Sequence, residues 1–373
     1  MLSMLWRSFF ENNGNGETPM EKNLLLVGSI PCDTAEEVFQ TWGATFGAHL
    51  KYLPDGEVGD RLHWIDGQAF HVFNGHPDIE TLKRPAPDNG VERWKPRDIE
   101  DQWTFKVKPG VDLVRFSDSG WRLGYARDAI SSYFVFKTLR NEGVLPDDIR
   151  FMVALPTPQS STVLFFKDPA DWPAAQGGYE AAMLAEVETM VRHIPHEDLA
   201  IQWDAACESV DIEFGLPWLG DEITPERYET YVEQFTRLSA SVPDGVALGY
   251  HACYGTLGGW PLVEPETLGK QVKFVNDAVA RSKRKVDFVH LPMLDRSDPE
   301  YATPLKDLEV NDAEVYLGLI HNIESFSVRL ANARRCLPAC KIAAPCGFGR
   351  IPPIQVQAVM DEHKKALEIY ASN

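Results

Sequence analysis

The chain has 373 residues, 44% of them hydrophobic, and a formal net charge of −19. A surface this acidic repels nucleic acid and anionic lipid headgroups, so we expect neither nucleic acid nor a membrane to be a partner. No apolar run approaches the roughly 20 residues of a membrane-spanning helix. The six cysteines form no CxxC pair, which indicates reduced thiols in a cytoplasmic protein.

The chain begins with a segment unlike the rest. Residues 1–20 are apolar at first and then rich in Asn and Gly, which predicts a flexible tail, and residues 21–373 are predicted to form a single domain. Leu24 to Gly28 is a short, fully apolar strand of the buried parallel kind. A helix that begins at Asp33 or Thr34 follows to about Phe46, and a second strand lies near 50–53.

Residues from about 65 to 125 break this regularity. They are irregular and rich in Pro, Trp and Asp, and we treat them as an insertion after the second strand. A long excursion of this kind is typical of a functional loop or lid. A surface hairpin without a role at the site is the alternative, and the sequence leaves both interpretations open.

From residue 126 onward, helices and strands alternate. We predict helices over 126–141, 179–193, 224–239, 265–282, 324–336 and 355–370, and strands over 150–155, 199–204, 246–250, 286–291, 314–320 and 341–344. With the first two strands this makes eight, nearly all followed by a helix, which indicates a parallel sheet. The predicted fold class is therefore α/β, a (β/α)₈ TIM barrel with a long insertion after strand 2.

Polar side chains follow the predicted strands at their C-terminal ends. In a barrel these ends meet at one mouth, which is the active face. The sequence therefore predicts an enzyme whose site includes Ser29, Glu57, Asp204, His251, Cys253, His321 and Cys346.

A metal ion is one use for part of this set. His251 and Cys253 are two residues apart at the end of a strand, so both side chains point to the same face. Imidazole and thiolate are ligands that zinc accepts. Cys346 and His321, further along the chain, are possible partners. The alternative is that the cysteines only pack in the core.

Several strand-end segments resemble motifs of the catalytic barrel of cobalamin-independent methionine synthase, whose superfamily also contains uroporphyrinogen decarboxylase. The resemblance extends from about Leu24 to Arg350. The segments that carry it are Val27-Gly-Ser29, Asp55-Gly-Glu57-Val-Gly-Asp60, Gln202-Trp-Asp204, His251-Ala-Cys253-Tyr254, Ile320-His321 and Cys346-Gly347 with Arg350 behind it.

The resemblance implies that some of these residues bind substrate. Ser29, Glu57 and Asp204 would hold an amino-acid substrate, the two carboxylates through its amino group. Arg61, close to Glu57, is a further candidate, although Glu57 and Arg61 could equally form a simple ion pair.

The resemblance also implies a metal and a proton donor. His251, Cys253 and Cys346 would bind Zn²⁺, and His321 would donate a proton to the leaving group, so that His321 and Asp204 are the candidate catalytic residues. A glutamate ligand of the family is missing, because Pro292 stands near its place. His290, two residues earlier on the same strand face, is either a substitute ligand or a core histidine.

A second departure concerns the Glu-Pro that follows the Gln-Ile-Asp segment in the family, where this chain has Ala205-Ala206. The function predicted from the sequence is a zinc-dependent alkyl transferase, of the methyltransferase kind, that uses a small-molecule thiol and an alkyl donor. Two other classes stay open: a metal-free lyase or hydrolase that uses His321 with Asp204 or Glu57, and a barrel that binds a small molecule without turning it over.

Overall fold

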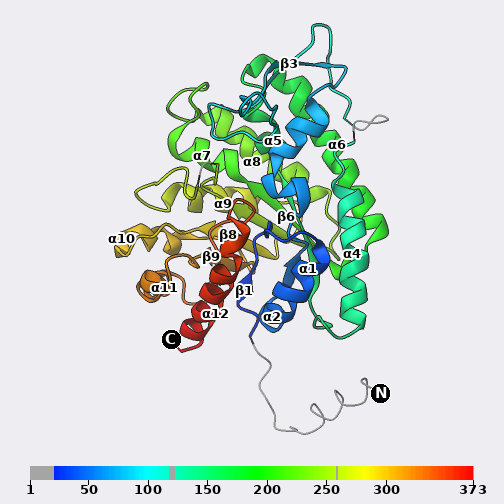
Figure 1. The fold of residues 1–373 in the computed structure, drawn as a ribbon. Coiled ribbons are helices and arrows are strands. Elements are labelled where there is room, and N and C mark those ends of the chain that lie inside the picture. Colours follow the sequence, from blue (N-terminus) through cyan, green and yellow to red (C-terminus); the bar gives the residue numbers. More distant parts are fainter. Residues whose placement is uncertain (1–20, 117–121, 258, 373) are drawn as a thin grey trace, which may run out of the picture.

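A computed structural model describes residues 21–116, 122–257 and 259–372, so the predicted tail over 1–20 lies outside the described residues. Eight parallel strands form one sheet in the order β1-β10-β9-β8-β7-β6-β5-β2. A parallel bridge between Leu24 and Leu50 joins the two ends of this order. The sheet is thus a nearly closed barrel, which confirms the predicted fold (Figure 1). The strands are β1 (Leu24–Leu25), β2 (Tyr52–Pro54), β5 (Arg150–Pro156), β6 (Leu199–Ala205), β7 (Ala247–Ala252), β8 (Phe288–Pro292), β9 (Glu314–Gly318) and β10 (Lys341–Ala343).

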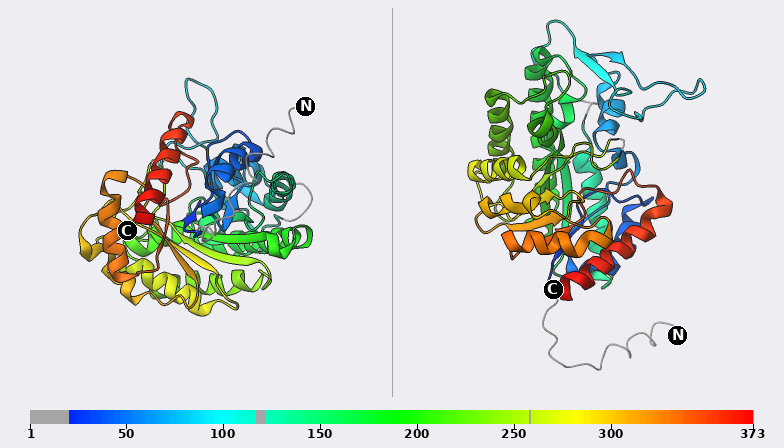
Figure 2. Two further views of the ribbon diagram at one scale, coloured as in Figure 1. Left: turned by 90° about the horizontal axis from the view of Figure 1, so that it is seen from below. Right: turned by 90° about the vertical axis from the view of Figure 1, so that its left-hand side faces the viewer.

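Helices surround the barrel, as the view in the left half of Figure 2 shows. Their starts follow the expected chemistry, since Thr34 and Thr224 cap α1 and α8 by accepting a backbone N–H of the first turn. None of the described helices is long and apolar enough to cross a membrane. The helices are α1 (Ala35–Val38), α2 (Ala44–Phe46), α3 (Ile65–Gln68), α4 (Tyr125–Asn141), α5 (Pro158–Val163), α6 (Trp172–His193), α7 (Ala206–Phe214), α8 (Pro225–Ala240), α9 (Gly269–Arg281), α10 (Pro299–Ala302), α11 (Ile323–Cys336) and α12 (Val356–Ser372).

The lower part of the barrel interior is apolar and filled. Side chains alternate between the inside and the outside of a strand, and each of the eight strands contributes one residue to a single buried cluster. These residues are Leu25, Tyr52, Met152, Ala200, Ala247, Phe288, Tyr316 and Ala343. Two or four residues further along four of these strands, the same series reaches polar side chains, which are Ser29, Gln202, Asp204, His251 and His290. Apolar side chains therefore close one end of the barrel, and these polar residues lie toward its C-terminal mouth.

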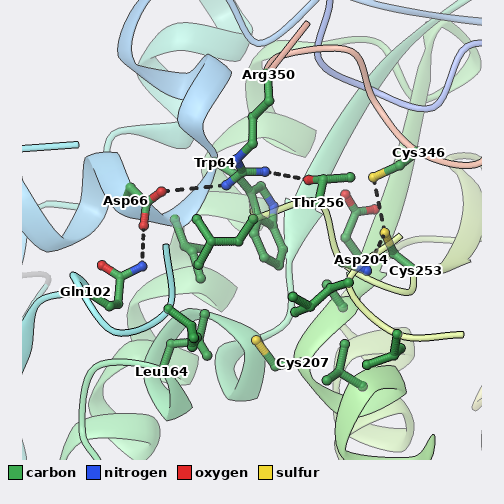
Figure 3. A pocket seen from close by; sticks show the side chains of 18 of the residues that line it. Trp64, Asp66, Gln102, Leu164, Asp204, Cys207, Cys253, Thr256, Cys346 and Arg350 are labelled. Carbon is green, nitrogen blue, oxygen red and sulfur yellow. Dashed lines mark hydrogen bonds and ion pairs between the residues drawn. The ribbon is translucent and has the colours of Figure 1, made fainter. Parts of the chain in front are cut away.

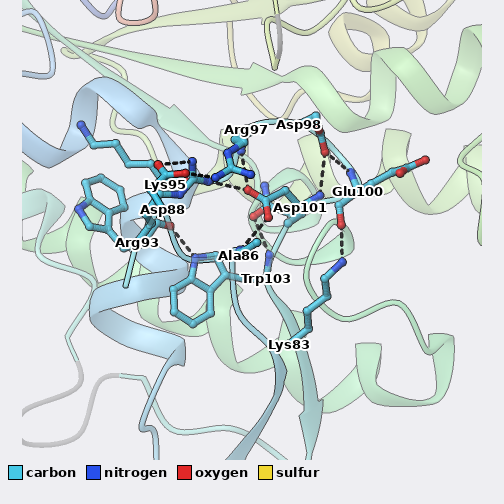
Figure 4. A network of polar contacts seen from close by, with 12 residues as sticks. Lys83, Ala86, Asp88, Arg93, Lys95, Arg97, Asp98, Glu100, Asp101 and Trp103 are labelled. Atoms are coloured by element: carbon cyan, nitrogen blue, oxygen red, sulfur yellow. Dashed lines mark hydrogen bonds and ion pairs between the residues drawn. The ribbon is translucent and has the colours of Figure 1, made fainter. Parts of the chain in front are cut away.

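The insertion after β2 is a packed part of the domain. It contains an antiparallel hairpin of β3 (Ile79–Lys83) and β4 (Thr104–Val107). Arg93 forms ion pairs with Asp88 and Asp101, and Arg97 also pairs with Asp88, so that the connecting loop is cross-linked by charges (Figure 4). Trp103 is buried and donates its indole N–H to the carbonyl of Trp94 at 2.8 Å.

Candidate functional site

Strand register brings the predicted polar residues to one level of the barrel mouth. Asp204 on β6 is the register partner of His251 on β7, which is in turn the partner of His290 on β8. Cys253 directly follows β7, and Cys346 lies three residues beyond the end of β10. These residues are far apart in the sequence but share one rim, as expected for the ends of parallel strands.

Three of these side chains form a tight cluster of metal-binding atoms. The ligand atoms of His251, Cys253 and Cys346 all lie within 4.8 Å of one another. The thiol of Cys253 donates to the Sγ of Cys346 over 3.1 Å, and the N–H of Gly255 donates to the Sγ of Cys253 at 3.3 Å. The shared hydrogen bond raises the pKa of Cys253 and lowers the pKa of Cys346.

His290 lies behind this cluster and contacts it through His251. Its Nε2 donates to the carbonyl of Ala344 at 3.0 Å, and its Nδ1 lies 2.7 Å from Nδ1 of His251. Burial lowers the pKa of both rings, that of His290 to about 4, so both are neutral near pH 7. A neutral His290 that donates through Nε2 must accept through Nδ1. His251 therefore carries its proton on Nδ1, and the lone pair of its Nε2 is available.

Two buried carboxyl groups stand beside the cluster, and neither forms an ion pair among the described residues. Burial raises the pKa of Glu57 to about 8. Burial, and then the nearby charge of Glu57, raises the pKa of Asp204 well above its ordinary value. Gln202 holds Asp204 in place, because its amide donates to Asp204 and to the carbonyl of Val27, both at 2.8 Å.

Arg61 does not pair with Glu57 in the structure. Its guanidinium binds both oxygens of Asp55, at 3.2 and 2.8 Å, and lies 3.5 Å from Asp128. Ser132 donates to the same Asp55 carboxylate at 2.7 Å. Arg61 therefore fixes the segment that carries Glu57, and it is not one of the side chains lining the main cavity.

The cluster opens into a cavity of about 500 Å³ that the strand ends and the insertion line together (Figure 3). Asp66 and Gln102 come from the insertion, and Gln102 donates to Asp66 at 2.8 Å. Arg350 donates to Thr256 at 2.6 Å and lies 3.6 Å from Asp66. The sequence predicted Arg350 only as part of a motif. It gave no signal for Asp66, Gln102 or Thr256, because their place depends on how the insertion folds back.

The two remaining predicted residues lie in different surroundings. Ser29 lines the cavity, and its Oγ accepts the N–H of Gly349 at 3.1 Å. His321 does not line the cavity: its Nε2 lies 2.7 Å from the carbonyl oxygen of Met293 and 2.9 Å from the guanidinium of Arg329. Burial and then the charge of Arg329 lower the pKa of His321 to about 4.

The fold is similar to that of several solved structures. A B12-independent methionine synthase from Shewanella sp. W3-18-1, determined in complex with selenomethionine, superposes with a TM-score of 0.58 over 94% of this chain and 98% of that chain, at 14% identity. The fold is that of the B12-independent methionine synthases. A Listeria monocytogenes protein provisionally described as a vitamin-B12 independent methionine synthase gives a TM-score of 0.52 over 95% of this chain and 99% of its own, also at 14% identity. No family model and no curated protein matches the sequence significantly.

Proposed function

We propose that this chain is a zinc-dependent alkyl transferase of the methyltransferase kind that acts on a small-molecule thiol. The observation that carries the proposal is the cluster of His251, Cys253 and Cys346, whose ligand atoms lie within 4.8 Å of one another at the floor of a cavity. The shared fold with methionine synthases agrees with this function and does not by itself establish it.

The donor set fits zinc. Two sulfur atoms and one imidazole nitrogen are soft and borderline ligands that zinc binds well, and three protein ligands leave a fourth position for a substrate. The available lone pair on Nε2 of His251 points to that nitrogen as the third ligand atom. When bound, zinc supplies the Lewis acidity that lets a substrate thiol lose its proton.

Glu57 and Asp204 suit the rest of the substrate. Two neighbouring buried carboxyl groups do not both ionise readily, and neither forms an ion pair among the described residues. Near neutral pH the pair therefore holds a proton for a leaving group, and a cationic group of the substrate would favour its ionised form. We do not assign that proton to His321, because its ring is hydrogen-bonded away from the cavity.

Zinc content tests the proposal directly. The purified protein is expected to hold about one zinc per chain by elemental mass spectrometry, as a three-ligand catalytic site does. Cys253→Ser should lower this about tenfold or more and abolish alkylation of a panel of small thiols by methyl donors, detected as thioether. Cys207→Ser is the matched control, because Cys207 is a buried cysteine that lines the same cavity outside the cluster.

Three other outcomes would reject the zinc transferase. Turnover without zinc would favour the acid–base lyase or hydrolase built on Glu57 and Asp204. A protein with neither zinc nor turnover of any thiol would be a binding barrel. An equal loss of zinc in Cys207→Ser and Cys253→Ser would mean that the cluster is not the zinc site.

A further inference from the structure

The cavity has two ends of different character. One end holds the sulfur and nitrogen cluster with Glu57 and Asp204. The rest, which we call the outer chamber, is walled by apolar side chains from α7 and from the loops after α5, α7 and β7, together with Trp64 just before the insertion. Its main apolar side chains are Leu164, Val210, Leu216, Trp218, Leu262 and Val263. Figure 3 shows Trp64 and Leu164 on the side of this cavity away from Cys346.

The polar groups that line the cavity disfavour an anionic ligand, because they include no free cation among the described residues. Four carboxyl groups line it: Glu57, Asp66, Asp204 and Asp221. Arg350 is the one arginine in the lining, which contains no lysine, and its guanidinium already binds Thr256 and faces Asp66 at 3.6 Å. An anionic group moved here from water would lose its hydration without gaining a free cation.

Trp64 is held in the chamber wall by an unusual backbone conformation. Its φ of 55° and ψ of −119° lie in a region that residues other than glycine rarely adopt, and its N–H donates to the carbonyl of Arg61 at 2.8 Å. Such a conformation is unfavourable and persists only where the surroundings impose it. Trp64 and Glu57 also line a second cavity beside Arg61 and Asp128, so the indole forms part of a partition between the two spaces.

We propose that the outer chamber binds an uncharged, apolar body of the alkyl-bearing substrate, and that Trp64 bounds the space this body occupies. The inference rests on the proposed function for the identity of that substrate, since the chamber leads directly to the sulfur atoms. A carboxylate- or phosphate-bearing body would lose its hydration without gaining a free cation from the lining residues, whereas a neutral body gains by removing apolar surface from water.

Two fluorescent probes that differ by one charge test the chamber in metal-free protein. N-phenylnaphthylamine is neutral, and anilinonaphthalene sulfonate carries the same rings with a sulfonate. The neutral probe is expected to bind one per chain, with a dissociation constant at least about tenfold lower than that of the sulfonate. Equal or tighter binding of the sulfonate would overturn the proposal.

Matched variants locate the binding. Leu262→Asp places a carboxylate at the chamber wall, at a position 42% exposed, where folding tolerates it; it should weaken binding of the neutral probe about tenfold. Leu82→Asp, on the hairpin and 55% exposed, should leave it unchanged. Trp64→Ala should also weaken binding of the neutral probe about tenfold, because it removes an apolar side chain from the chamber wall. Trp94→Ala should leave binding unchanged, because Trp94 does not line the cavity.

The outcomes separate this inference from the zinc proposal. Identical effects of Leu262→Asp and Leu82→Asp, on variants shown to be folded by circular dichroism, would place the probe outside the chamber and reject the inference. Probe binding as expected in a protein that never acquires zinc would reject the transferase and leave the apolar chamber standing.

Discussion

The hydrogen bond between His251 and His290 decides which nitrogen His251 presents at the cluster. Both rings are buried and neutral, and the carbonyl of Ala344 fixes the tautomer of His290 from behind. Partners of this kind set ring orientation and basicity in metal sites. His290 is thus best placed as a positioning residue behind the proposed ligand His251, although the sequence also allowed His290 as a ligand itself.

A substitution at His290 should therefore lower zinc affinity while the three proposed ligands remain in place. His290→Phe removes the acceptor and is expected to weaken zinc binding about 10- to 100-fold in competition with a chromophoric chelator. His290→Gln keeps an acceptor and should lose less. His363→Phe is the control, because His363 is a buried histidine that does not line the cavity and belongs to neither the cluster nor its hydrogen-bond partners. An equal loss in His290→Phe and His363→Phe would show that the effect is only one of stability.

Single residues also mark where prediction from sequence succeeds. His251, Cys253 and Cys346 could be predicted as neighbours because each lies at or shortly after the C-terminal end of a strand, and parallel strands bring such positions to one rim. Asp66 and Gln102 could not, because they reach the cavity through the tertiary path of the insertion. His321 also follows a strand, yet its side chain is bound by Met293 and Arg329. Strand-end position predicts the rim but not the direction of a side chain.

At the scale of elements, helix α6 and the insertion are joined by a close backbone approach. The N–H of Val114 donates to the carbonyl of Ala174 at 3.1 Å, and a Cβ at Gly178 would lie 2.0 Å from the carbonyl oxygen of Val114. The neighbouring Gly177 has room for a Cβ, with Leu113 at an ordinary 3.4 Å. The sequence predicted this helix from Tyr179, but it begins at Trp172. Its first turns, with two glycines, are stabilised by this packing rather than by propensity.

Adjacent glycines therefore make a matched test of how the insertion docks. Gly178→Ala is expected to lower the free energy of unfolding by about 1–3 kcal/mol in urea, because the methyl group collides with backbone. Gly177→Ala should raise it by about 0.5–1 kcal/mol, as alanine does in a helix that has space for it. Equal effects of the two substitutions would contradict the close approach and would mean that the insertion does not pack against α6 at Gly178.

At the scale of the whole molecule, the alternation of strands and helices in the barrel could be predicted from the sequence. The fold of the insertion could not. Eight apolar segments, nearly all followed by a helix, indicate a barrel, because a parallel sheet must have both faces covered and eight βα units are the number that closes a TIM barrel. The insertion has no such periodicity. Its hairpin is held by ion pairs of Arg93 with Asp88 and Asp101 and by packing of Trp103. These contacts join residues of the insertion that no periodic pattern marks as neighbours.

The barrel also determines how stability changes with pH, because it buries ionisable groups of both signs. Burial lowers the pKa of His321 and His363 to about 4. The unfolded chain binds their protons from about pH 6.5, so these histidines make the protein lose stability as the pH falls from about 6.5 to 4. Glu57 acts in the opposite sense. Its pKa is raised from 4.5 to about 8 in the folded chain, so stability is lost as the pH rises through this range.

Glu57→Gln isolates this second effect, since the histidines contribute equally to both proteins. In metal-free protein, the free energy of unfolding of Glu57→Gln minus that of the wild type should grow with pH between about 5 and 8, by at most about 1.4 kcal/mol per pH unit, and then level off. Urea denaturation at pH 5, 6.5 and 8 measures it, with Glu188→Gln at an exposed position of α6 as the control. A difference that stays constant across this range would mean that Glu57 is ionised in the free protein. Glu57 would then not be the proton donor, and the leaving group would need a proton from Asp204 or from elsewhere.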